Sequence, residues 1–131
     1  MPRVRTMPAS VYNRTVFTIR DYPRMVCEYE RLKRDTGVKA TNYDGMPKTA
    51  APGNSLEDKT AKLVDLEREI QLIRDALDAA PDDMRDGILN NIIYGMRFPL
   101  NEYGQLVPSL RTWQREKSMF VARVAHALKI Y

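Results

Sequence analysis

The segment from Ser109 to Arg115, SLRTWQR, holds the residues of this chain that are best suited to contact a nucleic acid. Serine is a favoured helix N-cap, and the free N–H groups at a helix start can bind a phosphate. Arg111 and Arg115 have the paired donors that match the acceptor edge of guanine. Gln114 matches adenine, and the methyl group of Thr112 matches that of thymine. The pattern indicates a helix whose first turns enter the major groove of duplex DNA.

This last helix is expected to span about residues 109–129 and to become core-facing after its polar start. Its apolar residues recur at helical spacing at Phe120, Val121, Val124, Ala125 and Leu128. Trp113 is too large for the groove and is expected to pack in the core. Polar residues off the apolar stripe extend the binding stretch to residue 123. The candidate DNA-binding residues are therefore Ser109, Arg111, Thr112, Gln114, Arg115, Ser118 and Arg123.

The segment before this helix predicts the first half of a helix-turn-helix unit. Pro81 followed by Asp82 and Asp83 marks a helix start, and Gly95 marks its end. Residues 97–108 contain two prolines and a glycine, so we expect no more than a short helical turn there. The helix-turn-helix is expected over about residues 84–129.

A longer helix is predicted from about residue 56 to residue 79. Ser55 and Asp58 have the spacing of a capping box. Apolar residues then recur by threes and fours and form a row, called here the 63–77 row: Leu63, Leu66, Ile70, Ile73 and Leu77. The row is short for a free-standing coiled coil, so packing inside a bundle is favoured over a dimer zipper.

The N-terminal part predicts an arm, a helix and a linker. Residues 1–13 have little pattern, and a helix is expected over about 23–35, beginning at Pro23 and stopped by Gly37. Cys27 is expected to pack on it as a small apolar residue. Residues 36–54 are rich in glycine, proline and turn formers and predict a long linker. The expected organisation is an arm and helix (1–35), a linker (36–54) and a helical DNA-binding domain (55–131).

Composition and charge limit the function classes. Hydrophobic residues are 44% and charged residues 29% of the chain, as in ordinary globular domains. Residues 1–55 hold ten Lys/Arg and five Asp/Glu, residues 56–86 hold five and ten, and residues 97–131 hold six and two. The chain is therefore basic, acidic and basic in turn, within a net charge of +4. A basic last helix suits a polyanion.

The sequence has no pattern typical of a metal site, a cofactor site or an enzyme active site. A single cysteine and a single histidine, Cys27 and His126, do not make a zinc site of the usual kind. We expect no metal, no cofactor and no enzymatic activity, because the sequence has no glycine-rich phosphate loop and no nucleophile–base pair. With no signal peptide and no membrane-spanning segment, a cytoplasmic location is expected.

Three stretches of the chain carry a family resemblance: SLRTWQREKSMFVARVAHAL, DYPRMVCEYERLKRD and SLEDKTAKLVDLEREIQLI. The first is similar to the closing helix of the RinA/ArpU-type phage transcriptional regulators, and the other two are similar to the earlier helices of that family. The resemblance covers about residues 16–129. It implies a helix-turn-helix like region 4 of sigma factors, a recognition helix holding Arg111, Thr112, Gln114 and Arg115, and activation of late or packaging genes in prophages. The sequence departs from the family pattern at Gly104, which lies five residues before Ser109 in a segment between Pro99 and Pro108. The geometry of the turn in the helix-turn-helix depends on this segment.

The expected function is thus an all-α, prophage-type regulator that binds double-stranded DNA. RNA polymerase and a second copy of the chain are the further partners considered. The alternative is a non-catalytic protein-interaction or phage assembly module that uses the 63–77 row, with the basic helix merely solvated.

Overall fold

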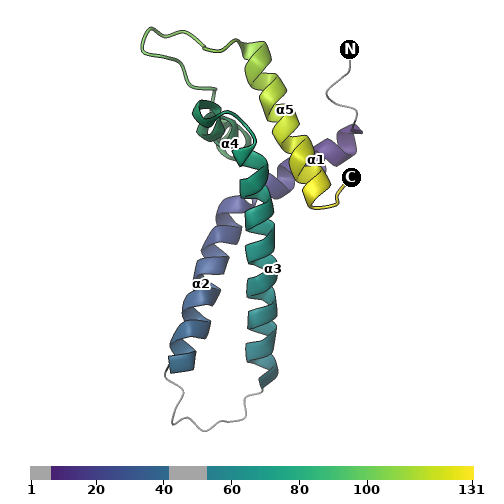
Figure 1. Cartoon of the computed structure of the whole chain (residues 1–131), viewed down its shortest axis with the longest axis vertical. Helices are drawn as coiled ribbons and strands as arrows, with labels where there is room; N and C mark the ends of the chain where they lie inside the picture. The colour runs from purple at the N-terminus through teal and green to yellow at the C-terminus, as the bar shows by residue number, and fades with distance from the viewer. Residues whose placement is uncertain (1–6, 42–52) are drawn as a thin grey trace. The chain divides into compact units, whose positions relative to one another are not determined.

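The described part of the chain is entirely helical. The computed structural model describes residues 7–41 and 53–131. Their helices are α1 (Ala9–Arg20), α2 (Tyr22–Thr41), α3 (Gly53–Asp78), the 3₁₀ turn η1 (Asp82–Met84), α4 (Arg85–Tyr94) and α5 (Leu110–Ala127) (Figure 1). No strand occurs in these residues, so the expected all-α helical bundle is confirmed. None of the helices in the described ranges is both long enough and apolar enough to cross a membrane.

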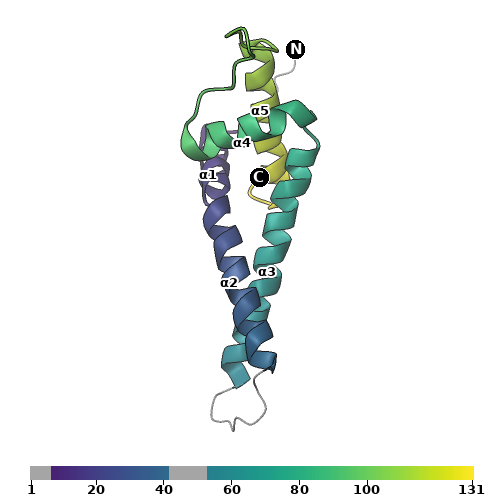
Figure 2. The ribbon, with the colours of Figure 1, turned by 90° about the vertical axis from the view of Figure 1, so that its left-hand side faces the viewer.

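The chain divides into two compact units. The first unit comprises Met1–Tyr22 and Gln71–Tyr131, and the second comprises Pro23–Ile70. In the first unit α1 packs against α4 and α5, and α4 lies across them (Figure 2). The core of this unit contains the fully buried side chains of Ile19, Ile73, Ile88, Ile92, Trp113, Phe120, Val121 and Val124. The candidate DNA-binding helix α5 is therefore held by a buried apolar core that it shares with α1 and α4.

Side-chain bonds to backbone carbonyls tie the helices of the first unit together. Arg20 Nε on α1 donates to the carbonyl oxygen of Ile92 on α4, at 3.0 Å. Arg123 Nε on α5 donates to the carbonyl oxygen of Ala76 on α3, also at 3.0 Å. Both carbonyls lie near the C-terminal ends of their helices, where the helix itself supplies no donor. The two arginines thus satisfy helix ends while they fix α1 and α5 in place.

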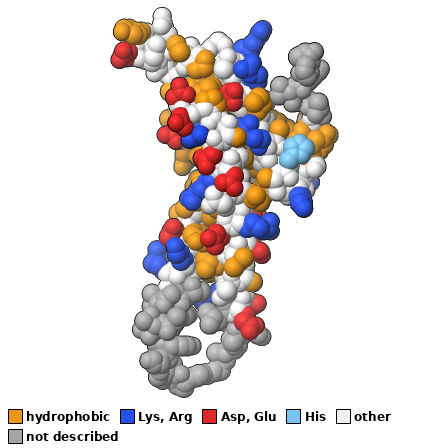
Figure 3. Space-filling model, in the orientation of Figure 1, with side chains coloured by type: hydrophobic (Ala, Val, Ile, Leu, Met, Phe, Trp, Pro, Cys, Tyr) orange, Lys and Arg blue, Asp and Glu red, His pale blue; other side chains and the backbone are white. Residues whose placement is uncertain are grey.

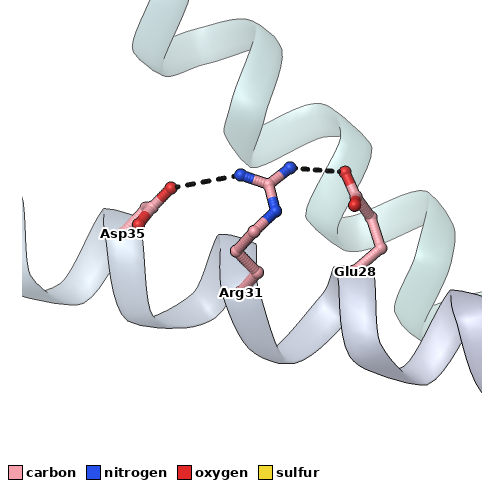
Figure 4. A network of polar contacts seen from close by, with 3 residues as sticks. All are labelled: Glu28, Arg31 and Asp35. Carbon is pink, nitrogen blue, oxygen red and sulfur yellow. Dashed lines mark hydrogen bonds and ion pairs between the residues drawn. The ribbon is translucent and has the colours of Figure 1, made fainter.

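The second unit consists of most of α2 and the first part of α3. Its buried apolar residues are Met25, Leu32 and Ile70. On the exposed side of α2, Arg31 lies between two carboxylates (Figure 4): its Nη2 is 2.7 Å from Glu28 Oε2, and its Nη1 is 3.6 Å from Asp35 Oδ2. Such pairs along a helix stabilise it by about 0.2–0.5 kcal/mol each. They also neutralise this arginine within its own helix.

The N-terminal helices differ from the sequence expectation. The expected arm of residues 1–13 becomes helical at Ala9, because extended Pro8 acts as the N-cap and its carbonyl accepts the N–H groups of Val11 and Tyr12, both at 3.1 Å. Asp21 then separates α1 from α2. Gly37 does not stop α2, since one glycine costs only about 1 kcal/mol inside a helix.

Three further expectations need correction. The linker expected over residues 36–54 is helical at both ends, up to Thr41 and from Gly53, and its middle lies outside the described residues. Ser55 is not the N-cap of α3, because the helix begins at Gly53 and places this serine inside the first turn. Cys27 is exposed and does not pack as an apolar residue.

The middle of the chain follows the expectation closely. The Pro81–Asp83 start leads into η1 and α4, and Gly95 ends α4 in the left-handed conformation, with a φ of 67°. Residues 97–108 agree with the expectation of no more than a short helical turn, because none of them is helical. A loop, residues 95–109, joins α4 to α5 in place of the short turn of about 3–4 residues in a helix-turn-helix.

Candidate nucleic-acid interface

Ser109 caps α5 as its position predicts. The residue is extended, with φ −66° and ψ 162°, and its Oγ accepts the backbone N–H of Thr112 at 3.3 Å. The Ser109 and Thr112 hydroxyl oxygens are 3.2 Å apart and share a hydrogen bond. The cap leaves the first N–H groups of the helix without intrahelical acceptors, and the helix dipole adds positive potential there. This end of α5 is therefore suited to an anionic group.

The first turns of α5 present free polar side chains to solvent. Arg111, Gln114 and Arg115 are exposed, while Thr112 and Ser118 are half-buried. In the part of the chain that the structure describes, neither Arg111 nor Arg115 has an ion-pair partner. Five of the seven predicted residues thus share the accessible face and the cap: Ser109, Arg111, Gln114, Arg115 and Ser118. Thr112 contributes mainly through its hydroxyl at the cap.

Lys117 lies at the edge of this face and was missed by the sequence prediction. It follows Arg111 and Gln114 at steps of three, and this row winds from the exposed face towards the buried side of α5, where Lys117 is half-buried beside Trp113 and Phe120. Burial lowers the pKa of the Lys117 ammonium, and the positive charge of Arg20 on α1 lowers that pKa further. The spacing of the row is visible in the sequence. The approach of Arg20, which is distant in sequence, is not.

Arg123 belongs to the bundle and not to the exposed face, which corrects its assignment to the binding stretch. Its Nε is engaged with the carbonyl of Ala76, and its Nη2 is buried without a hydrogen-bond partner. Burial lowers the pKa of this guanidinium, although the carboxylate of Glu116 acts in the opposite direction. Its position on the helix faces the end of α3, so it fixes α5 instead of reaching outward.

Trp113 anchors the loop before α5 to the core, which confirms the prediction that it is a core residue. It is 2% exposed, and its ring stacks on Phe98 with the centroids 4.8 Å apart. Gly87 on α4 makes room for this stack: a Cβ atom there would lie 2.8 Å from both Trp113 Cη2 and Pro99 Cδ. The position of the α5 start thus depends on one glycine and two rings.

The charges of the first unit are segregated. Acidic side chains are exposed along the end of α3, η1 and the start of α4: Asp75, Asp78, Asp82, Asp83 and Asp86. Figure 3 shows Lys and Arg side chains over the start of α5 and acidic side chains over the end of α3. A polyanion is attracted to the first region and repelled by the second, which favours one orientation.

The described residues contain no group of three or more His, Cys, Asp or Glu side chains arranged to hold a metal ion. No family model, no curated protein and no solved structure matches this chain. The resemblance to the RinA/ArpU-type regulators therefore remains a prediction, and the functional interpretation rests on the geometry of α5.

Proposed function

We propose that this chain is a DNA-binding protein that contacts duplex DNA through the first half of α5 and serves as a transcriptional regulator of the RinA/ArpU type. One observation carries the proposal: α5 is capped and polar at its exposed start and apolar and buried in its second half. A recognition helix needs this division, because one half must reach the groove while the other holds the helix in the domain.

The side chains divide into two roles. Arg111, Gln114 and Arg115 are long enough to reach base edges from the helix start, and each can form a bidentate contact. The capped N-terminus at Ser109 meets a phosphate through backbone N–H groups. Such phosphate contacts set the register of the helix on the duplex, and the base contacts supply the sequence preference.

Lys117 and Arg20 form a second phosphate-contacting position at the edge of this face. The row from Arg111 through Gln114 leads to Lys117, and Arg20 lies close enough to repel its charge. Two cations near each other are unfavourable without an anion, and a DNA phosphate supplies one. In this proposal the helices that support α5 touch the DNA backbone beside the groove, as supporting helices of DNA-binding domains generally do.

A mobility-shift titration tests the proposal. DNA from the neighbourhood of the gene is compared with unrelated duplex at several salt concentrations. Arg111→Ala and Arg115→Ala are each expected to weaken binding by about 1–3 kcal/mol if they contact guanine, or to reduce the salt slope by about one unit if they contact phosphate. Arg68→Ala, at an exposed position of α3 in the second unit, is the matched control and should change nothing.

Two results would contradict this function. One is a wild-type protein that retards no duplex even at low salt. The other is a folded Arg111→Ala/Arg115→Ala variant, checked by circular dichroism, that binds as well as the Arg68→Ala control. The role in activating late or packaging genes, with RNA polymerase as a partner, follows the same proposal and needs a reporter assay once a DNA site is known.

The alternative of an interaction module built on the 63–77 row has less support. Ile70 is 4% exposed and Ile73 is 1% exposed, so the middle of the row is already covered by the chain itself. Leu63, Leu66 and Leu77 are half-buried. Among the described residues, most of the exposed large hydrophobic side chains lie elsewhere, between Tyr94 and Leu110; the others are Phe17, Val64 and Tyr131.

A further inference from the structure

The loop between α4 and α5 exposes an unusual amount of apolar surface. From the last residue of α4 to the first residue of α5, six large hydrophobic side chains are half or more exposed: Tyr94 (64%), Met96 (52%), Leu100 (60%), Tyr103 (77%), Val107 (59%) and Leu110 (50%). The loop arches away from both helices (Figure 1). Figure 3 shows hydrophobic side chains at its outer end, at the upper left.

The loop has a defined conformation although most of its large side chains are exposed. At its base, Phe98 stacks on Trp113. At its tip, the Asn101 side-chain oxygen accepts the N–H groups of Tyr103 and Gln105, both at 2.9 Å. The Asn101 N–H donates to the Gln105 carbonyl at 2.8 Å, and Gly104 takes the left-handed φ of 74° that closes the turn. A surface held in one shape loses little entropy on binding a partner.

The exposed area suits a protein interface of ordinary size. Six large side chains at these exposures present on the order of 600 Å², taking about 150–200 Å² for a whole side chain. The summed area compares with about 300–600 Å² for the largest single apolar patch on a typical monomer. If an equal area of a second molecule covers it, the total approaches the roughly 1,200 Å² at which specific interfaces begin.

We propose that a second copy of this chain covers the loop, in a two-fold dimer that packs loop against loop. A second copy presents the same six exposed side chains, so two loops supply both halves of the required area. The charges also fit self-association: the loop residues 95–109 contain two charged side chains, Arg97 and Glu102, which are of opposite sign and both exposed. When a two-fold axis passes between these two positions, Arg97 of each copy meets Glu102 of the other.

This dimer would have a direct consequence for DNA recognition. The loop leads straight into Ser109 and the start of α5, so a two-fold axis at the loop produces a pair of related recognition helices. Such a pair matches two half-sites of inverted sequence. The dimer itself does not rest on the proposed DNA binding, and it can be tested without DNA.

Sedimentation velocity of the full chain over a concentration series is the test. The wild type is expected to move from monomer to dimer as concentration rises, and Leu100→Ser/Tyr103→Ser is expected to stay monomeric with unchanged helical circular dichroism. Phe17→Ser is the matched control, because Phe17 is an equally exposed hydrophobic residue (71%) on α1, outside the loop. It should dimerise like the wild type.

Three outcomes would overturn the proposal. They are a wild type that stays monomeric throughout the series, a loop variant that dimerises as well as the wild type, and a Phe17→Ser variant that loses the dimer while the loop variant keeps it. In the third case, α1 supplies the interface. Failure of DNA binding with an intact dimer would count against the proposed function alone.

Discussion

Gly87→Ala tests the packing that positions α5. Gly87 is buried in α4 against the ring of Trp113 and the side chain of Pro99. An added Cβ would lie 2.8 Å from Trp113 Cη2, Trp113 Cζ3 and Pro99 Cδ, which is too close without movement. All three neighbours belong to rings, and the indole is itself held by its stack on Phe98. The methyl group cannot be accommodated by rotation of a flexible side chain.

Two opposing effects decide the magnitude. Alanine is favoured over glycine inside a helix by about 1 kcal/mol. Overpacking of a filled core costs about 1–3 kcal/mol, and contact with rigid rings places this site at the upper end. We therefore expect Gly87→Ala to lower the free energy of unfolding by about 2 kcal/mol and the Tm by several degrees.

Urea denaturation followed by circular dichroism measures this change. A double-mutant cycle with Trp113→Phe isolates the contact, because a smaller ring removes the two closest indole carbons. The two substitutions should be clearly non-additive, with the double variant more stable than the sum of the single effects predicts. If Gly87→Ala unfolds at the same or a higher urea concentration than the wild type, Trp113 does not pack on α4 as described, and the placement of α5 is wrong.

Three further predictions concern single positions. Ser109→Ala should cost about 1 kcal/mol in urea denaturation through loss of the cap, whereas Ser109→Asp should keep the stability and weaken DNA binding by repelling phosphate. Because the pKa of Lys117 is lowered in the folded state, stability should rise as pH passes upward through that pKa towards the ordinary lysine value. Lys117→Met should flatten this rise of stability with pH and stabilise the free protein at neutral pH by less than about 1 kcal/mol. It should also reduce the salt dependence of DNA binding. An unchanged dependence of stability on pH would contradict the lowered pKa of Lys117. Asn101→Ala should speed hydrogen exchange at the amides of Tyr103 and Gln105 without loss of helicity, and unchanged protection would show that the turn does not depend on this side chain.

Much of the fold depends on local signals that can be predicted from the sequence. Ser109 caps α5, Gly95 ends α4 in a left-handed conformation, and the Pro81 segment begins the turn into α4. Each of these involves atoms within a few residues of one another, so neighbouring sequence is enough to predict it. The exposed positions of Arg111 and Arg115 follow similarly, because helical periodicity assigns them to the face opposite Phe120.

The same local reasoning fails where two weak effects compete. Gly37 is a helix-ending residue by type, yet α2 continues to Thr41. The intrinsic cost of about 1 kcal/mol is small enough for the surrounding helix to outweigh it. Pro8 shows the reverse: it acts as the N-cap of α1 because its carbonyl accepts two backbone N–H groups, a use that the unpatterned first residues did not suggest.

The tertiary structure alone decided which polar side chains of α5 are engaged by other helices. By type, Arg123 and Arg115 are equivalent, but the carbonyl at the end of α3 engages Arg123. Lys117 gains its electrostatic neighbour only because Arg20 on α1 is held against α4. The two hydrogen bonds join residues that are 72 and 47 positions apart in the sequence. Helical periodicity in the sequence does not predict contacts at such separations. The sequence determined where helices form and which faces are apolar, and packing determined which polar side chains remained free to bind.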